Sequence, residues 1–188
     1  MPAAVARRLV AAVLLIHGAM LAWGAYRHSP TIDEVRRLPA GVVIWTDLRF
    51  SALQVNGPLV RMVAAIPLLL APPESVADGG SARDVFGNLQ QTDGVRFAWL
   101  FTLGRWACIP FSLVGGYVCF RWARDLYGTA PGFVAMILWC FSPNVLGNAQ
   151  IVADDVSAAA FGLAAAYFFW LWLREPSWER VLLAGAGL

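Results

Sequence analysis

The feature that most limits the fold of this chain is its long runs of uncharged, apolar residues. The first run extends from Leu9 to Tyr26, about 18 residues behind Arg7-Arg8, and a helix of about that length crosses a bilayer. Hydrophobic residues make up 59% of the chain and charged residues only 14%, whereas a soluble domain carries about 25% charged residues. Because a helix satisfies its own backbone hydrogen bonds in lipid, the sequence predicts an all-α integral membrane protein.

The hydropathy pattern predicts one membrane domain over residues 1–188, a helical bundle with about four complete transmembrane helices and the start of a fifth. A long first extracytoplasmic loop, carrying short interfacial helices, separates the first two spans. A cleavable signal peptide is the alternative interpretation of the first segment. The expected spans are 9–26, 97–120, 130–147 and 156–173, the fifth begins within 179–188, and the loop is 27–95.

Arginines stand at three of the expected span ends, and all three ends agree on one orientation. Segments rich in Lys and Arg beside a span stay in the cytoplasm. The pattern therefore predicts a multi-pass protein of the cell (inner) membrane, with a cytoplasmic N-terminus and with the loop 27–95 and the turn 142–155 outside. The arginines concerned are Arg7, Arg8, Arg121, Arg124 and Arg174.

Two acidic pairs fall on the expected outer face beside helix ends: Asp33-Glu34 and Asp154-Asp155. One interpretation is capping, since Thr31 and Glu34 have capping-box spacing and acids complement the N-terminal end of a helix. If Glu34 mainly caps, Glu34→Gln is expected to do less harm than Asp33→Asn, because Gln also serves at that position. The other interpretation is a shared, water-accessible site, in which Asp33 faces a cleft while Thr31 and Glu34 cap the helix.

Two arginines lie within apolar segments. Arg105 falls inside the second span, where a charged side chain usually has a partner or faces a polar cavity; snorkelling to the headgroups is the alternative. Arg61 lies in an apolar stretch too short to cross a membrane, which predicts an interfacial helix. There it is either a lipid headgroup anchor or a substrate ligand. The net charge of +2 is too small to indicate nucleic acid as a partner.

The order of these elements resembles the GT-C membrane glycosyltransferases, nearest the protein O-mannosyltransferase and aminoarabinose-transferase branch (glycosyltransferase family 39-like). Asn56, Pro58 and Leu59 match an Asn-Pro-Pro-Leu-like element of that family, and an acidic residue of its outer turn aligns with Asp155. The matching stretches are "TIDE", "NGPLVRMVAAIPLL", "GRWACIPFSLVGGYVCFRWARDLYG" and "LWCFSPNVLGNAQIVADDVSAAAFGLAAAYFFWLWLR".

The resemblance implies transfer of a sugar from a polyprenyl-phosphate donor to a protein or glycolipid acceptor, at the outer face of the membrane. Asp33, Glu34 and Asp155 are then the expected catalytic acids, with Asp33 taking the proton of the attacking hydroxyl. Members of the fold differ in metal use, so no cofactor is assigned and a divalent metal stays open. The expected ligands of substrate and lipid phosphate are Arg61, Arg105, Asn56 and Asp154, since arginine binds phosphate through paired donors.

Two residues depart from the family pattern. Gly57 replaces the usual first proline, and Arg37 stands where the family often has a histidine. The chain also has fewer spans than its relatives, so we expect an N-terminal part of a longer module. The alternative function is a non-catalytic membrane protein: a transporter-like or scaffold fragment, or an inactive family member. A transporter places polar groups near mid-membrane, whereas the charges here, apart from Arg105, gather at the outer face, which favours the transferase.

Overall fold

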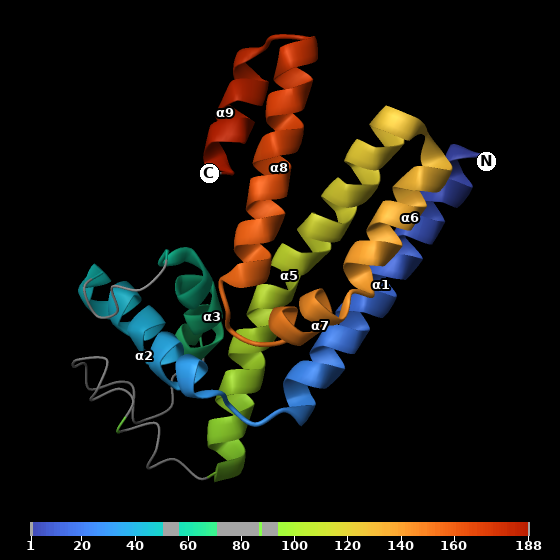
Figure 1. Cartoon of the computed structure of the whole chain (residues 1–188). Helices are drawn as coiled ribbons and strands as arrows, with labels where there is room; N and C mark the ends of the chain where they lie inside the picture. Colours follow the sequence, from blue (N-terminus) through green and yellow to red (C-terminus); the bar gives the residue numbers. More distant parts are fainter. Residues whose placement is uncertain (1, 51–56, 71–86, 88–93, 188) are drawn as a thin grey trace. The chain divides into compact units, whose positions relative to one another are not determined.

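The regular structure of this chain is helical. The computed structural model describes residues 2–50, 57–70, 87 and 94–187, and within those residues there are helices and no strand (Figure 1). The all-α fold class is therefore confirmed. The helices are α1 (Ala3–Arg27), α2 (Ile32–Asp47), α3 (Leu59–Leu70), α5 (Gly94–Tyr127), α6 (Thr129–Cys140), α7 (Pro143–Ala149), α8 (Asp155–Arg174) and α9 (Trp178–Ala186).

Three of these helices, α1, α5 and α8, are long and apolar enough to cross a membrane, with 25, 34 and 20 residues. The pair α6 and α7 passes the same test jointly but is bent by 54°. The apolar helix α3 has only 12 residues, as expected for a segment too short to span. The described residues thus contain three candidate spans, or four if the bent pair counts as one, which fits a helical membrane protein.

The expected span 130–147 differs from the structure, because the chain breaks between α6 and α7. Pro143 is the first residue of α7. A proline disfavours helical geometry at the residue before it, here Ser142, and it cannot donate a hydrogen bond to the preceding turn. Its fixed φ suits the first turn of a new helix. The proline therefore accounts for both the end of one helix and the start of the next.

The chain divides into two compact units. One consists of Met1–Met20, Pro110–Gly147 and Asp155–Leu188, and the other of Leu21–Ile109 with Asn148–Asp154. Helices α1 and α5 contribute residues to both units. The second unit contains most of the residues that the sequence singled out.

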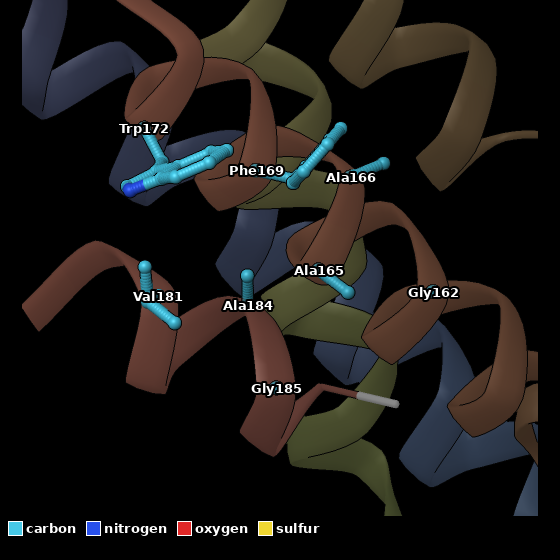
Figure 2. A pocket seen from close by; sticks show the side chains of 8 residues that line it. All are labelled: Gly162, Ala165, Ala166, Phe169, Trp172, Val181, Ala184 and Gly185. Carbon is cyan, nitrogen blue, oxygen red and sulfur yellow. The ribbon is translucent and has the colours of Figure 1, made fainter. Parts of the chain in front are cut away.

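Within the first unit, a buried polar contact connects α1 and α5. His17 Nε2 lies 2.9 Å from Ser112 Oγ, and Trp139 of α6 donates its indole N–H to the Ser112 carbonyl at 3.0 Å. Helix α9 packs on α8, and an open apolar groove of about 510 Å³ lies between them (Figure 2). The lining residues are Gly162, Ala165, Ala166, Phe169, Trp172, Val181, Ala184 and Gly185.

In the second unit α2 packs closely on α3. The buried stretch of α2 runs from Leu38 to Ile44, and at Gly41 a side chain would collide with the backbone carbonyl of Arg61. Glycine therefore permits the two backbones to approach, as small residues do at helix contacts in membranes. Trp45 donates its indole N–H to the Met62 carbonyl at 2.9 Å. This packing fixes the position of α2, whose first turn carries the acidic pair. The remaining parts of the loop 27–95, residues 51–56, 71–86 and 88–93, lie outside the described residues.

Candidate functional site

The site begins at the N-terminus of α2, which has the capping box that the sequence predicts. Thr31 is the N-cap, with extended φ and ψ of −84° and 160°. The Glu34 amide donates to Thr31 Oγ1 at 3.4 Å, and the Thr31 amide donates to Glu34 Oε2 at 2.9 Å. These two bonds satisfy amides that a helix N-terminus otherwise leaves without partners. The capping interpretation of Glu34 is confirmed.

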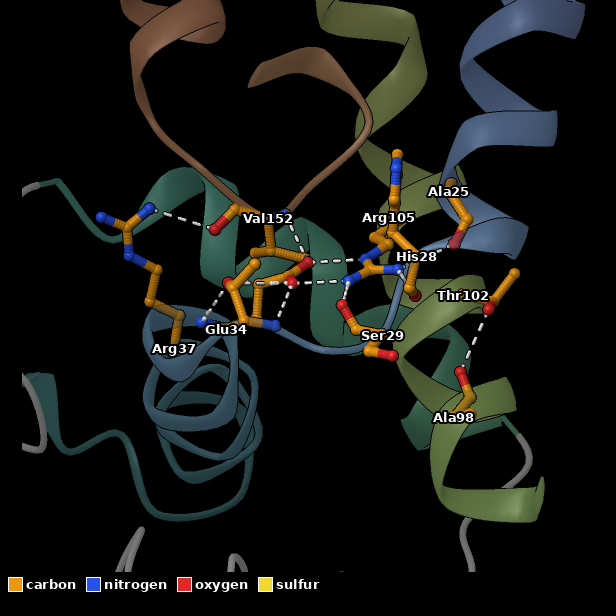
Figure 3. Close-up of polar contacts among 10 residues, drawn as sticks. Ala25, His28, Ser29, Glu34, Arg37, Ala98, Thr102, Arg105 and Val152 are labelled. Atoms are coloured by element: carbon orange, nitrogen blue, oxygen red, sulfur yellow. Dashed lines mark hydrogen bonds and ion pairs between the residues drawn. The ribbon is translucent and has the colours of Figure 1, made fainter. Parts of the chain in front are cut away.

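Glu34 does more than cap, because its carboxylate is also paired with Arg105 of α5. Arg105 Nε donates to Oε1 and Nη2 to Oε2, each at 2.7 Å, which is the bidentate geometry of the strongest arginine–carboxylate contacts. Both side chains are 0% exposed. Figure 3 shows the pair at the centre of a hydrogen-bond network. The expectation that Arg105 has a partner is therefore confirmed, and the partner is Glu34.

The other donors of Arg105 bind the last turn of α1 and the two residues that follow it. Nη1 donates to the carbonyls of Ala25 and His28 at 2.8 and 2.7 Å, and Nη2 also donates to Ser29 at 2.9 Å. The last carbonyls of a helix lack partners within the helix, and a cation there is favoured by the helix dipole. Arg105 thus caps α1 while it holds the carboxylate that caps α2. All five N–H donors of a guanidinium are used within the protein.

The same carboxylate holds a segment more than 100 residues away in the sequence. Glu34 Oε1 accepts the Val152 amide at 2.9 Å, and Arg37 Nη1 donates to the Val152 carbonyl at 3.0 Å (Figure 3). Arg37 Nη1 also lies 3.3 Å from Asp154 Oδ2. Two residues one turn apart on α2 therefore bind both backbone groups of Val152, and this fixes the segment Asn148–Asp154 against the helix.

Glu34 is held in its ionised form. Burial alone raises the pKa of this carboxyl, but the hydrogen bonds from Arg105, Thr31 and Val152 and the charge of Arg105 outweigh burial and lower the pKa below its ordinary value of 4.5. The two oxygens already accept five hydrogen bonds. A carboxylate with this many donors is a poor proton acceptor, so the geometry favours a structural role for Glu34 over a direct chemical one.

Asp33 has the opposite surroundings. It lies in the first turn of α2, is exposed to solvent, and has no recorded partner in the part of the chain that the structure describes. Residues four apart lie on the same side of a helix, so Asp33 and Arg37 share a face of α2. Asp33 is thus a solvent-exposed carboxylate on a helix turn whose backbone is fixed by its neighbour Glu34.

Arg61 adds a second positive charge to this region. It is 5% exposed and lies on α3, which packs on α2. Burial lowers the pKa of Arg61, the nearby carboxylate of Asp154 opposes that effect, and the positive charge of Arg37 adds to the lowering. Arg37, Arg61 and Asp154 therefore act on one another electrostatically.

The expected site residues fall into three groups. Glu34, Arg61, Arg105 and Asp154 belong to one unit and to this network, although Arg105 has no donor left for a lipid phosphate. Asp155 is exposed and begins α8 in the other unit, so a site that Asp155 shares with Asp33 stays a prediction. Asn56 lies outside the described residues. Within the described ranges no three His, Cys, Asp or Glu side chains are grouped to hold a metal ion.

The sequence did not predict that Glu34 and Arg37 bind the backbone of Val152. Arg37 attracted notice only as a departure from a family pattern, and Val152 is an ordinary apolar residue. Its contacts use backbone groups, which every residue possesses, so no side-chain pattern marks it. The one available signal was the spacing of Glu34 and Arg37, which places an acceptor and a donor one turn apart on the same helix.

Comparison with models of protein families, with curated proteins and with solved structures finds no match to this chain.

The ion pair changes the expected effect of Glu34→Gln. Although glutamine can still cap, it leaves the guanidinium of Arg105 buried without a counter-charge, and breaking a buried pair in this way costs about 3–5 kcal/mol. Thr31→Ala removes only the cap and costs about 0.5–2 kcal/mol. We expect Glu34→Gln to lower the free energy of unfolding in detergent micelles by clearly more than Thr31→Ala. Equal losses would show that Glu34 acts only as a cap.

The lowered pKa of Glu34 also predicts a pH dependence. The unfolded chain takes up the proton near 4.5 and the folded chain at a lower pH, so the stabilisation is complete above about pH 4.5 and is lost as the pH falls through the folded pKa. The difference in unfolding temperature between the wild type and Glu34→Gln should be largest at neutral pH and shrink in acid. A difference that stays constant from pH 7 to pH 3 would contradict the lowered pKa.

Proposed function

We propose that the chain belongs to a membrane glycosyltransferase that transfers a sugar from a polyprenyl-phosphate donor to a protein or glycolipid acceptor. The observation that carries the proposal is the contrast within the acidic pair: Glu34 is buried and saturated with hydrogen bonds, whereas Asp33 is exposed. A general base needs an accessible carboxylate in a defined position. The buried neighbour supplies the position, and Asp33 supplies the carboxylate.

The proposed reaction has one bond formed and one bond broken at the sugar. The acceptor hydroxyl attacks the anomeric carbon, its proton passes to Asp33, and the bond from that carbon to the phosphate oxygen breaks. The polyprenyl phosphate leaves with the bonding electrons and gains negative charge in the transition state. Positive groups near the leaving phosphate stabilise that charge, and Arg61 is the expected residue for this role. No metal ion is assigned to the step.

The proposed location is the outer face of the inner membrane. The arginines beside the candidate spans support a cytoplasmic N-terminus, and α2 then begins on the outer side, because α1 is long enough to cross the bilayer. A hydroxyl acceptor and a lipid-linked donor would meet Asp33 at that surface.

Asp33→Asn should abolish transfer without lowering the amount of folded protein. Asparagine keeps the size and accepts hydrogen bonds at a helix start but takes up no proton at neutral pH, and loss of a general base costs about 10²–10⁴ in rate. Asp47→Asn, at the other end of the same helix, is the matched control. Both variants should be expressed from the native reading frame and assayed for sugar transfer and membrane abundance together. Near-normal turnover of Asp33→Asn at normal abundance would rule out Asp33 as the general base.

The orientation has its own test in single cysteines placed at exposed positions of a chain lacking Cys108, Cys119 and Cys140. An impermeant maleimide added to intact spheroplasts should label Ile32→Cys but not Tyr127→Cys, and permeabilisation should make both reactive. Labelling of Tyr127→Cys in intact spheroplasts would reverse the proposed topology.

A further inference from the structure

We infer that one exposed face of α1 and α5 contacts phospholipid directly, and that its aromatic side chains mark where the hydrocarbon of the bilayer ends. Together these side chains form the aromatic band: Trp23, Tyr26, Trp99 and Trp106. The inference goes beyond the proposed sugar transfer, because it concerns the lipid around the helices and the depth at which Arg105 lies. It also holds for either orientation of the chain in the membrane.

The exposed residues of α1 form one stripe whose chemical character changes along the helix. Residues three or four apart share one side of a helix, and the exposed residues Ile16, Met20 and Trp23 follow this spacing. Tyr26 and Arg27, both exposed, continue the stripe to the end of α1. The stripe thus passes from aliphatic side chains through aromatic ones to a cation, which is the order expected from the hydrocarbon to the headgroups of a bilayer.

The exposed stripe of α5 shows the same order in the opposite chain direction. Arg96 lies in the first turn of α5, Trp99 follows three residues later, and Trp106 follows seven residues after that. The next exposed residues on this stripe, Pro110 and Val114, are apolar. Both helices therefore pass from arginine through aromatic residues to apolar ones, although α1 approaches this boundary at its C-terminal end and α5 at its N-terminal end.

The aromatic band is continuous between the two helices. The ring centroids of Tyr26 and Trp99 lie 6.4 Å apart and those of Trp99 and Trp106 lie 5.4 Å apart, each pair edge to face. Trp23 lies 6.4 Å from Tyr26, and Trp106 donates its indole N–H to the Ala22 carbonyl at 3.1 Å. All of these residues belong to the second unit. The band is therefore one surface at one level of the two helices.

A recess of about 610 Å³ adjoins the band where α1 ends and α5 begins, and it has the mixed chemistry of the headgroup region. Its wall includes the rings of Tyr26 and Trp99, the guanidinium of Arg27 and the hydroxyl of Thr102. Aromatic residues with an apolar body and a polar tip are favoured where hydrocarbon meets water. Helices that contact one another in a membrane mostly do so through small residues, whereas the band consists of large ones. The chemistry of this face thus favours phospholipid over another helix as its partner.

The band also determines the depth of the buried Arg105. Arg105 precedes Trp106 by one residue, a rise of about 1.5 Å along the helix. It binds the carbonyls of Ala25 and His28, which lie on either side of Tyr26 in the sequence (Figure 3). The ion pair therefore lies at the level of the headgroups, where a charge costs less than at the centre of the bilayer.

Spin labels on the two stripes test the inference. Single cysteines are placed in a chain lacking Cys108, Cys119 and Cys140, labelled with a nitroxide and measured in phosphatidylcholine nanodiscs for accessibility to oxygen and to a water-soluble nickel chelate. Oxygen concentrates in hydrocarbon and the chelate in water. Oxygen should dominate at Ile16→Cys and Met20→Cys, the chelate should dominate at Arg27→Cys, and the two should be nearly balanced at Trp106→Cys.

Two results would overturn the inference. Low accessibility to both reagents at Met20→Cys and Trp106→Cys would show that protein covers this face in place of lipid. Oxygen dominating at Trp106→Cys as strongly as at Ile16→Cys would place Arg105 within the hydrocarbon and remove the boundary. Neither result depends on sugar transfer, so the inference and the role proposed for Asp33 can fail separately.

Replacing part of the band gives a second measurement with a matched control. The double variant Trp23→Leu/Trp99→Leu extends the aliphatic surface towards Arg27, so a label at Met20→Cys should shift towards the bilayer centre and its oxygen-to-chelate ratio should rise. Trp178→Leu, which removes a highly exposed tryptophan of α9, should leave that ratio unchanged. Equal shifts in the two variants, or no shift in either, would show that the band does not set the boundary. If the double variant fails to fold, the labels on the chain with the intact band decide alone.

Discussion

The described structure of the second unit depends on one buried ion pair, Glu34 with Arg105. Removing two charges from water costs several kcal/mol for each ion, and the cost is offset only when the geometry is good and the remaining donors and acceptors are satisfied. Both conditions hold here. Two 2.7 Å hydrogen bonds join the pair, and the other donors and lone pairs are bound to the end of α1, the start of α2 and the backbone of Val152.

The pair explains how segments distant in sequence are held together. Arg105 closes the C-terminal end of α1, Glu34 closes the N-terminal end of α2, and the two residues are 71 positions apart. Because each helix end needs hydrogen-bond partners, a single charge pair satisfies two ends and fixes the short linker between them. The exposed Asp33 and the half-buried Arg37 then stand on the first two turns of a helix whose start is fixed. Groups held in this way by buried partners are better placed for binding or catalysis than groups on a mobile loop.

Much of this arrangement was predictable from sequence. Helical spans follow from uncharged runs, the capping box from the spacing of Thr31 and Glu34, and a partner for Arg105 from the cost of a charge in an apolar helix. The identity of that partner was not predictable, because the capping role already accounted for Glu34. The prediction that Glu34→Gln does less harm than Asp33→Asn assumed that Glu34 mainly caps, and the ion pair with Arg105 removes that condition. No sequence pattern marks the binding of the Val152 backbone by Glu34 and Arg37. The break before Pro143 was not predicted, because the residues on both sides of it are mostly apolar.

The most direct test of the central claim is a double-mutant cycle for Glu34→Gln and Arg105→Gln, with the free energy of unfolding measured in mixed micelles for the wild type, each single variant and the double variant. Removing either charge leaves the other buried and unpaired, whereas removing both does not. The account predicts that the double variant loses less stability than the sum of the two single losses, by about 1–3 kcal/mol. Single losses that add to within about 0.5 kcal/mol would contradict it and show that the two charges contribute independently.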